Sequence, residues 1–253
     1  MYQLRFLGVG NAHASALGNS SAVLELGGVP RLLIDCGPTV PDAYQRLYGA
    51  SLPEAIFITH NHLDHIAGLE TLFYRVACTG GLLQQVRLYV PAAIIERLHA
   101  QLGNDPMRLA EGGVNFWDCF HLVPVSDHFW HAGLAFDVFA VQHHAYRSAW
   151  GLALSGVFLF TGDTRPIPEV LARFAADRET VFHDCALHGN PSHTGLADLA
   201  AFYPRDMRQR LVLYHYESAL AGEQMRKRGY RVALPGGRFQ LGSGCAESDL
   251  RSA

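Results

Sequence analysis

Short apolar runs separated by turn residues dominate the first half of the chain. Each run is aliphatic or β-branched and is bounded by Gly, Pro, Asn or Asp, which is typical of β-strands. The runs predict strands at Tyr2–Val9, Ser21–Leu26, Arg31–Cys36, Ala55–Thr59 and Val86–Val90. Pro91 then opens the segment AAIIERLHAQLG, where a proline at the first position and a glycine at the end predict a helix.

Strands and helices alternate in the second half. Further strands are predicted around Val114–Val123, Phe136–Gln142, Gly151–Leu154 and Val157–Thr161. Three helical segments then each precede a strand: PIPEVLARFAA before Thr180–Phe182, TGLADLAAFYP before Arg210–Tyr214, and ALAGEQMRKRG before Tyr230–Leu234. Two mostly-β stretches decorated with helices predict two sheets packed face to face with helices outside. Because no linker, repeat or low-complexity segment interrupts the pattern, we expect one domain over residues 1–253.

Composition narrows the class of protein. Of the 253 residues, 49% are hydrophobic and 17% charged, and the net charge of -3 shows no basic excess that would make nucleic acid an obligatory partner. No apolar run approaches the roughly 20 residues that a membrane span needs, and the N-terminus lacks the pattern of a secretory signal. The five cysteines show no CxxC spacing and predict reduced thiols. We therefore expect a cytoplasmic protein with no membrane partner.

Histidine is the unusual residue, at fourteen copies, and it is the commonest metal ligand in proteins. The segment FITHNHLDHIAGLE places His60, His62, Asp64 and His65 directly after a predicted strand. In an extended segment the side chains of His60, His62 and Asp64 point the same way, and that of His65 points elsewhere. Two metal positions are therefore easier to serve than one.

This HxHxDH string resembles the signature of the metallo-β-lactamase superfamily. The segments LLIDCG upstream and FAVQHH, FTGDTRP and LVLYHYE downstream match strand-end motifs of that superfamily in order and spacing, from Phe6 to about Glu217. The resemblance implies an α/β fold, a four-layer αββα sandwich of two mixed β-sheets, which agrees with the pattern of strands and helices. It also implies that Asp35 is a buried acid that orients the ligands.

Carried over residue by residue, the resemblance implies two metal positions. His60, His62 and a histidine of FAVQHH would hold the first metal, and the second would be held by Asp64, His65 and His215, with Asp163 bridging both. We favour His143 over His144 as the third histidine, because family strands end with an apolar residue, any residue and then the ligand. Histidine and carboxylate ligands without thiolate suit two divalent ions, Zn²⁺ or Mn²⁺, with Fe²⁺ also compatible.

An aspartate at the bridging position is typical of ribonuclease Z and its phosphodiesterase relatives. The segment HDCALHGNPSHTGLADLAAF is similar to a second ribonuclease Z pattern, in which an acid follows a strand and a later histidine precedes a helix. This resemblance implies that His193 is a general acid or transition-state stabiliser, that Asp184 orients it, and that Asp64 is catalytic as well as a ligand. The alternative is a helix-capping loop in which His193 is incidental.

The spacing between two of these motifs bears on the substrate. Ribonuclease Z enzymes that process tRNA precursors carry a long arm between the third histidine and the GDT motif, whereas only about eighteen residues separate His144 from Asp163. We therefore expect a dinuclear metal phosphodiesterase that cleaves a cyclic nucleotide, a cyclic ribose phosphate or a short oligonucleotide by attack of a metal-bridging hydroxide. The alternatives are a ribonuclease Z-type RNA endonuclease, or a carboxylic ester, thioester or lactone hydrolase on the same fold. The branch also implies a homodimer.

The remaining histidines and one tryptophan have simpler interpretations. His121, His128 and His131 are loosely spaced and have no accompanying carboxylates, so we expect ordinary loop or surface histidines. Trp150 could stack on a base, but its position in a predicted strand favours a core or interface aromatic residue.

Overall fold

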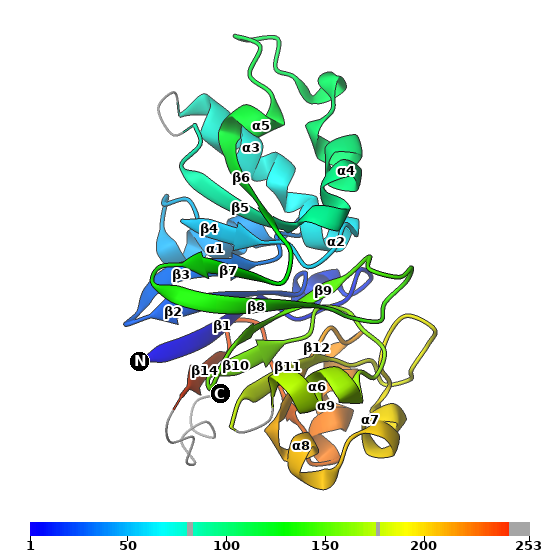
Figure 1. Ribbon diagram of the computed structural model, residues 1–253. Helices are drawn as coiled ribbons and strands as arrows, with labels where there is room; N and C mark the ends of the chain where they lie inside the picture. The colour runs from blue at the N-terminus through cyan, green and yellow to red at the C-terminus, as the bar shows by residue number, and fades with distance from the viewer. Residues whose placement is uncertain (80–82, 176–177, 243–253) are drawn as a thin grey trace.

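Two mixed seven-stranded sheets form the protein in a computed structural model (Figure 1). The structure describes residues 1–79, 83–175 and 178–242. In spatial order, the first sheet consists of β14 (Arg238–Leu241), β1 (Tyr2–Gly8), β2 (Ser21–Leu26), β3 (Val29–Ile34), β4 (Ala55–Phe57), β5 (Val86–Pro91) and β6 (Phe120–Val125). The strands from β3 to β6 pair in parallel, whereas β14, β1, β2 and β3 pair antiparallel.

The second sheet repeats this division into a parallel and an antiparallel half. In spatial order, it consists of β13 (Arg231–Val232), β12 (Leu211–Tyr214), β11 (Thr180–Asp184), β10 (Phe158–Phe160), β9 (Trp150–Leu154), β8 (Leu134–Ala140) and β7 (His128–His131). The strands from β10 to β13 pair in parallel, and those from β7 to β10 antiparallel.

Helices gather on the outer sides of the two sheets (Figure 1). Those that accompany the first sheet are α1 (Val40–Tyr48), α2 (Leu63–Ile66), α3 (Gly68–Cys78), α4 (Ile95–Leu98) and α5 (Phe116–Cys119). Those that accompany the second are α6 (Pro168–Phe174), α7 (Leu196–Phe202), α8 (Arg205–Arg210) and α9 (Ala219–Lys227). The predicted αββα sandwich of two mixed sheets is confirmed. Among the described residues, no helix is both long and apolar enough to cross a membrane.

Aromatic side chains join the two sheets in the core. Phe6 of β1 is fully buried, and its ring centroid lies 6.3 Å from that of Phe160 on β10, 5.5 Å from Phe182 on β11 and 5.6 Å from Tyr214 on β12. Because three neighbouring strands of the second sheet meet one side chain of the first, this cluster fixes how the sheets face each other. Trp150 is also buried, as expected for a core aromatic residue.

The carboxyl ends of the parallel strands position the candidate site. In the first sheet, Asp35 follows β3 directly and His60 lies three residues beyond β4. In the second sheet, Asp163 follows β10, Asp184 ends β11 and His215 follows β12. Parallel neighbours place these ends at the same edge of a sheet, which is where open α/β sheets commonly bind ligands.

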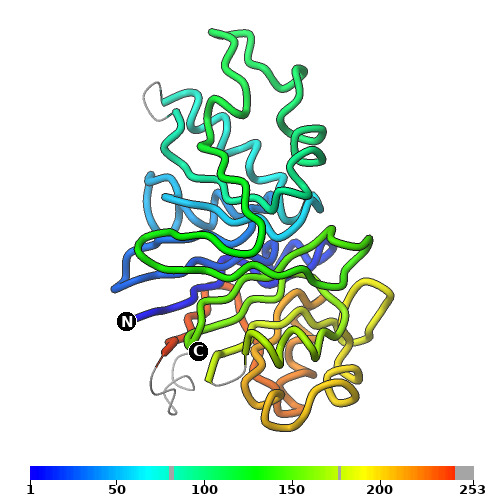
Figure 2. The backbone as a smooth tube through the Cα atoms, viewed as in Figure 1, coloured from blue at the N-terminus to red at the C-terminus, as the bar shows by residue number. Residues whose placement is uncertain are grey.

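The segment between β5 and β6 differs from the prediction. Pro91 ends β5 instead of opening a helix, and residues 92–103 form a 3-10 turn (Ala92–Ile94), α4 and a π-helix (His99–Gly103). The predicted strand at Val114–Val123 is wrong over its first part, because Asn115 begins helix α5. The Asn115 side chain accepts hydrogen bonds from the backbone of Trp117 and Asp118, and the Asp118 carboxylate accepts one from the Asn115 backbone. This capping box offsets the β-propensity of the segment. In Figure 2, the chain between α4 and α5 projects away from the sheets at the top.

His131 is a second difference, because it is buried and not a surface residue. It ends edge strand β7, where Nδ1 lies 3.2 Å from the Tyr89 hydroxyl and Nε2 lies 3.0 Å from the Arg31 carbonyl oxygen. These partners belong to the other sheet, so His131 connects the two sheets. His121 and His128 are exposed, as expected.

Candidate metal centre

One group of ligand atoms comes from the segments that follow β4, β8 and β10. His62 Nδ1 lies 3.0 Å from His60 Nε2 and 3.1 Å from His143 Nε2. Asp163 Oδ2 lies 3.6 Å from His60 Nε2 and 4.0 Å from His143 Nε2. The four residues thus present three nitrogen atoms and one oxygen atom that lie within 4.8 Å of one another.

A second group of ligand atoms also lies close to Asp163. His65 Nε2 is 3.4 Å from Asp64 Oδ2, and His215 Nε2 is 3.7 Å from the same oxygen atom. Asp163 Oδ2 lies 3.3 Å from His65 Nε2 and 3.2 Å from His215 Nε2. One carboxylate oxygen of Asp163 therefore stands between both groups, and the structure brings together all seven residues expected as metal ligands.

The atoms of both groups suit divalent metal ions. Ligands at 2.0–2.2 Å from a tetrahedral zinc ion lie about 3.3 Å apart, which is close to most of the separations above. His65 Nε2, His215 Nε2 and Asp163 Oδ1 are buried and make no hydrogen bond within the described part of the chain. Leaving such atoms unpaired is costly unless they bind something else. Imidazole and carboxylate donors without thiolate are compatible with zinc, manganese or iron.

His143, and not His144, points into the first group. His143 is buried, and its Nδ1 donates to the Ser192 carbonyl oxygen over 2.9 Å, which leaves the Nε2 lone pair free to face His62. The His144 side chain is exposed, although its ring centroid lies 4.7 Å from that of His62. His62 is also exposed, so the group opens to solvent on this side.

The backbone is strained at Asp35 and His215, where the chain leaves β3 and β12. Asp35 has φ 60° and His215 has φ 67°, which is the left-handed region that non-glycine residues rarely adopt. Such conformations cost on the order of 1–3 kcal/mol and persist where the surrounding structure imposes them, often at functional sites. At both positions the left-handed turn directs a side chain from the strand end into the site.

Asp35 is fully buried and contacts residues next to or among the expected ligands. Its Oδ1 accepts from the Thr59 backbone over 2.8 Å, and its Oδ2 accepts from the Thr59 hydroxyl over 2.7 Å and from His65 Nδ1 over 2.8 Å. The Thr59 hydroxyl also lies 3.0 Å from His60 Nδ1. One carboxylate therefore fixes the ring orientation of a histidine in each group, directly for His65 and through Thr59 for His60.

We expect Asp35→Asn to lower metal affinity by about 10–100-fold, the range typical of lost ligand support. Asparagine tolerates the left-handed backbone. Its NH₂ group, however, would face the Thr59 hydroxyl and His65 Nδ1, which now donate hydrogen bonds to Oδ2. Competition with a fluorescent zinc chelator measures the affinity. A variant that binds zinc as tightly as the unaltered protein would contradict this role, and Asp42→Asn, at an exposed carboxylate paired with Arg75, is the control.

His193 and Asp184 lie beside the second group. His193 Nδ1 is 2.8 Å from Asp184 Oδ2, and His215 Nδ1 is 3.4 Å from Asp184 Oδ1. The His193 ring stacks on that of His215 at 5.0 Å and lies 4.8 Å from that of His143. Asp184 is fully buried, whereas 20% of the His193 side chain is exposed. His193 is thus oriented through Nδ1, and its Nε2 remains available to a substrate at the solvent side.

The two groups differ in electrostatics. Burial lowers the pKa of His60 well below its usual range and that of His143 to about 4, so both rings are neutral ligands at pH 7. Burial also opposes charge on His215, but Asp163, Asp184 and Asp64 outweigh it and raise its pKa to about 10. The second group therefore strongly favours positive charge, whether as protons or as a divalent cation.

Sequence reasoning missed the hydroxyl residues that tie the site together. Thr59 contacts Asp35, Thr164 follows Asp163, and Thr194 follows His193; all three are fully buried. The only signal in the sequence was their position next to a predicted site residue, which does not tell a buried threonine from a solvated one.

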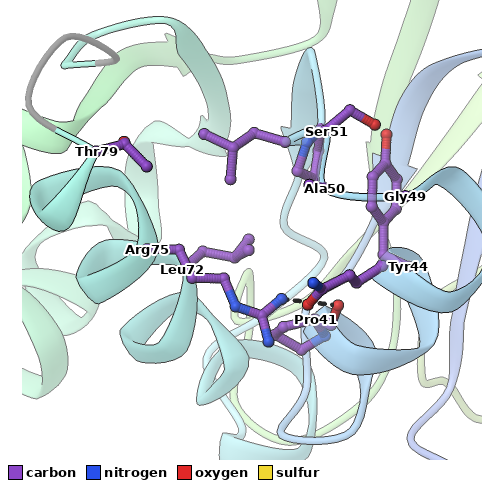
Figure 3. Close-up of a pocket in the computed structure, with 11 residues that line it drawn as sticks. Pro41, Tyr44, Gly49, Ala50, Ser51, Leu72, Arg75 and Thr79 are labelled. Atoms are coloured by element: carbon purple, nitrogen blue, oxygen red, sulfur yellow. Dashed lines mark hydrogen bonds between the residues drawn. The ribbon is translucent and has the colours of Figure 1, made fainter.

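Two cavities lie away from these residues. The first, of about 330 Å³, is lined by α1 and α3 residues that include Tyr44, Leu72 and Arg75 (Figure 3). The second, of about 430 Å³, is lined by β8 and α6 residues. None of the predicted site residues lines either cavity.

Comparison with known proteins places this arrangement among metal-dependent hydrolases. The family model described as "Anti-Pycsar protein Apyc1" matches residues 2–234. A protein of that name from Paenibacillus xerothermodurans is 30% identical over 229 residues, which cover 86% of this chain and 89% of the relative. One from Bacillus phage BSP38 is 27% identical over 265 residues, with 94% and 98% covered.

Solved structures share the fold at low sequence identity. The metallo-β-lactamase fold protein YhfI from Bacillus subtilis has a TM-score of 0.73 at 14% identity and covers 95% of this chain and 100% of its own. A diphosphatase from the PhnP family has a TM-score of 0.73 at 18% identity, with 95% and 98% covered. The short form of human tRNase Z has a TM-score of 0.63 at 18% identity, with 94% and 98% covered. The fold is the metallo-β-lactamase fold, as predicted.

Proposed function

The chain belongs to the anti-Pycsar protein Apyc1 family, and from that premise we propose that it hydrolyses a small phosphodiester, with a cyclic nucleotide as the foremost candidate. It is a metal-dependent hydrolase of the phosphodiesterase class. The observation that carries the proposal is the position of Asp163 Oδ2, within 4.0 Å of a nitrogen atom of His60, His65, His143 and His215. A carboxylate shared between two groups of ligands would hold two metal ions close together, as two-metal phosphoryl transfer needs.

We propose two divalent ions, zinc or manganese, with iron also compatible. His60, His62 and His143 would hold one ion, Asp64, His65 and His215 would hold the other, and Asp163 would serve both. Bound there, such ions supply a nucleophile from water at neutral pH and neutralise charge on the phosphoryl oxygens. The protein's part is to hold the ligands rigid, which Asp35 does through Thr59 and His65.

His193 completes the proposed mechanism. As water attacks phosphorus, the ester P–O bond breaks and the leaving oxygen gains negative charge. His193 donates a proton from Nε2 to that oxygen, while Asp184 accepts a hydrogen bond from Nδ1 and stabilises the protonated ring. Asp184 and the neighbouring Asp163 raise the pKa of His193 despite the opposing effect of burial, which favours the protonated form that a general acid needs.

The short segment between His143 and Asp163 favours a small substrate. That segment consists mainly of a short exposed turn at residues 144–148, followed by β9 and β10, which belong to the second sheet. It provides no arm to grip a folded RNA, and the net charge of -3 provides no general attraction to nucleic acid. These features favour a cyclic nucleotide, a cyclic ribose phosphate or a short oligonucleotide over tRNA precursors.

The test is a substrate panel on metal-reconstituted protein. The panel contains 3′,5′- and 2′,3′-cyclic nucleotides with purine and pyrimidine bases, short oligonucleotides, a tRNA precursor, a carboxylic ester, a thioester and a lactone. We expect turnover of a cyclic nucleotide at the highest kcat/KM. Preferred cleavage of the tRNA precursor, or of a carboxylic ester, thioester or lactone, would establish the corresponding alternative instead.

Three further expectations concern domain organisation, assembly and location. We propose that the chain acts as one domain, because a continuous hydrophobic core contains residues of both sheets. The homodimer and the cytoplasmic location stay predictions.

A further inference from the structure

Three consecutive residues of the β11–α7 loop each contact a different part of the site. The Ser192 carbonyl oxygen accepts from His143 Nδ1 over 2.9 Å, and His193 Nδ1 lies 2.8 Å from Asp184 Oδ2. Thr194 donates twice to the Thr164 carbonyl oxygen, from its backbone over 2.9 Å and from its hydroxyl over 2.8 Å. The loop that carries the proposed general acid is thus held by the same elements that hold the ligands.

Thr164 provides the carbonyl oxygen that accepts these two hydrogen bonds. It directly follows the bridging residue Asp163, and its backbone N–H donates to Asp184 Oδ2 over 2.9 Å. Its hydroxyl accepts from the backbone of Gln142, the residue before His143, over 3.1 Å. Thr164 therefore connects the bridging carboxylate, the acid that orients His193 and the strand end that bears a third histidine ligand.

The rest of the loop is held mainly by its own hydrogen bonds, in which Asn190 Oδ1 accepts from the backbone of Ser192 and His193, and the Asn190 N–H donates to the His193 carbonyl oxygen. Residues 188–191 are exposed, and among the described residues 188–194 Thr194 is the one whose side chain is completely buried. The backbone at Gly195 packs closely against Gly189, since a Cβ added at Gly195 would lie 2.0 Å from the Gly189 backbone nitrogen. Thr194 is therefore the buried side chain that ties this loop to the residue after Asp163.

We propose that the threonine pair, Thr164 and Thr194, positions His193 for proton transfer to the leaving oxygen. Thr194 does not touch the substrate: its hydroxyl holds the loop against the carbonyl of the residue after Asp163, and so sets the distance between the His193 imidazole and the ligand groups. This inference rests on the proposed phosphodiesterase function and adds to it a residue that acts only on the step assisted by His193.

The experiment compares leaving groups in Thr194→Val, which removes the hydroxyl and keeps the shape. A cyclic nucleotide leaves as a strongly basic alkoxide that needs a proton, whereas bis(p-nitrophenyl) phosphate releases a weakly basic phenolate that does not. Because small displacements of a catalytic group are costly, we expect kcat for the cyclic nucleotide to fall by about tenfold or more and kcat for the p-nitrophenyl ester to change by less than about twofold. KM and bound metal per chain, measured by plasma mass spectrometry, are expected to stay unchanged.

Two variants serve as controls. Thr194→Ser keeps the hydroxyl, and its kcat for the cyclic nucleotide is expected to equal that of the unaltered protein. This comparison holds even if Thr194→Val folds poorly. Thr79→Val removes a hydroxyl that donates to the Val76 carbonyl oxygen far from the site. It is expected to leave kcat unchanged for both substrates.

The possible results distinguish failure of the positioning role of Thr194 from failure of the proposed phosphodiesterase function. Equal losses on both substrates, no loss on either, or a loss of bound metal in Thr194→Val would overturn the positioning role while leaving the phosphodiesterase function in place. Failure of Thr194→Ser to restore activity would also overturn it. If the unaltered, metal-loaded protein hydrolysed neither phosphodiester, the proposed function itself would fail, and the inference with it.

Discussion

Asp163→Ala is expected to abolish phosphodiester hydrolysis, with kcat at least about a thousandfold lower, and to reduce the bound metal below two ions per chain. The reason is that Asp163 Oδ2 is the one carboxylate oxygen near histidines of both groups, 3.2 Å from His215 Nε2 and 3.6 Å from His60 Nε2. Without it, each group loses a donor, and the two positions are no longer joined. Steady-state hydrolysis and metal analysis by plasma mass spectrometry on the same sample measure both effects.

An exposed aspartate provides the matched control. Asp127 has a side chain that is 80% exposed and lies on the surface beside His128. Asp127→Ala removes the same group and is expected to leave kcat and bound metal unchanged. An Asp163→Ala protein that is folded, holds two metal ions and hydrolyses phosphodiesters at the unaltered rate would show that Asp163 does not bridge.

His193→Ala is expected to lower kcat for a cyclic nucleotide by about 10²–10⁴-fold, the usual contribution of a general acid. His193 is held by Asp184 through Nδ1 and belongs to neither proposed ligand set, so bound metal is expected to stay the same. The loss is expected to be much smaller for bis(p-nitrophenyl) phosphate, because its leaving group departs without a proton. The measurement is kcat for both substrates on metal-loaded protein.

His128→Ala is the control for this change, since His128 is an exposed histidine on edge strand β7. Two results would exclude His193 as the general acid. One is an equal loss on both substrates accompanied by a loss of metal, which would make His193 a ligand. The other is full activity on the cyclic nucleotide, which would make it incidental to the reaction, as in a helix-capping loop.

The sequence predicted most of what lies at the strand ends. Apolar strands followed within three residues by His or Asp mark the carboxyl ends of β3, β4, β10 and β12, because these side chains leave the sheet where the backbone turns. The string from His60 to His65 holds four potential ligands, three histidines and one aspartate, within six residues and therefore needed no long-range information. The architecture followed from the same pattern, since strands alternating with helices favour parallel pairing and outer helices.

Some local signals were present but went unused. Leu69, Leu72, Phe73 and Val76 follow the i, i+3, i+4, i+7 spacing of an amphipathic helix, and they are the buried face of α3. The capping box at Asn115 and Asp118 likewise indicates a helix start inside a segment rich in aromatic and β-branched residues. In both places a helix period or cap outweighs the propensity of individual residues.

Other features depend on contacts between distant parts of the chain. His131 is buried because Tyr89 and Arg31, from the other sheet, satisfy both of its ring nitrogen atoms. Thr164 and Thr194 meet across thirty positions of sequence, and each looks like an ordinary turn residue when taken alone. Hydrogen bonds of this kind follow from the packing of whole sheets, so pattern and propensity could not predict them.

The most direct test of the two-metal phosphodiesterase is a titration of chelator-stripped protein with zinc or manganese, in which hydrolysis of a 3′,5′-cyclic nucleotide is followed at each ratio of metal to chain. We expect no turnover of the stripped protein, a rise in turnover as metal is added, and a plateau at two ions per chain. Full turnover without metal, a plateau at one ion, or no turnover of any phosphodiester by folded protein that holds two ions would contradict it.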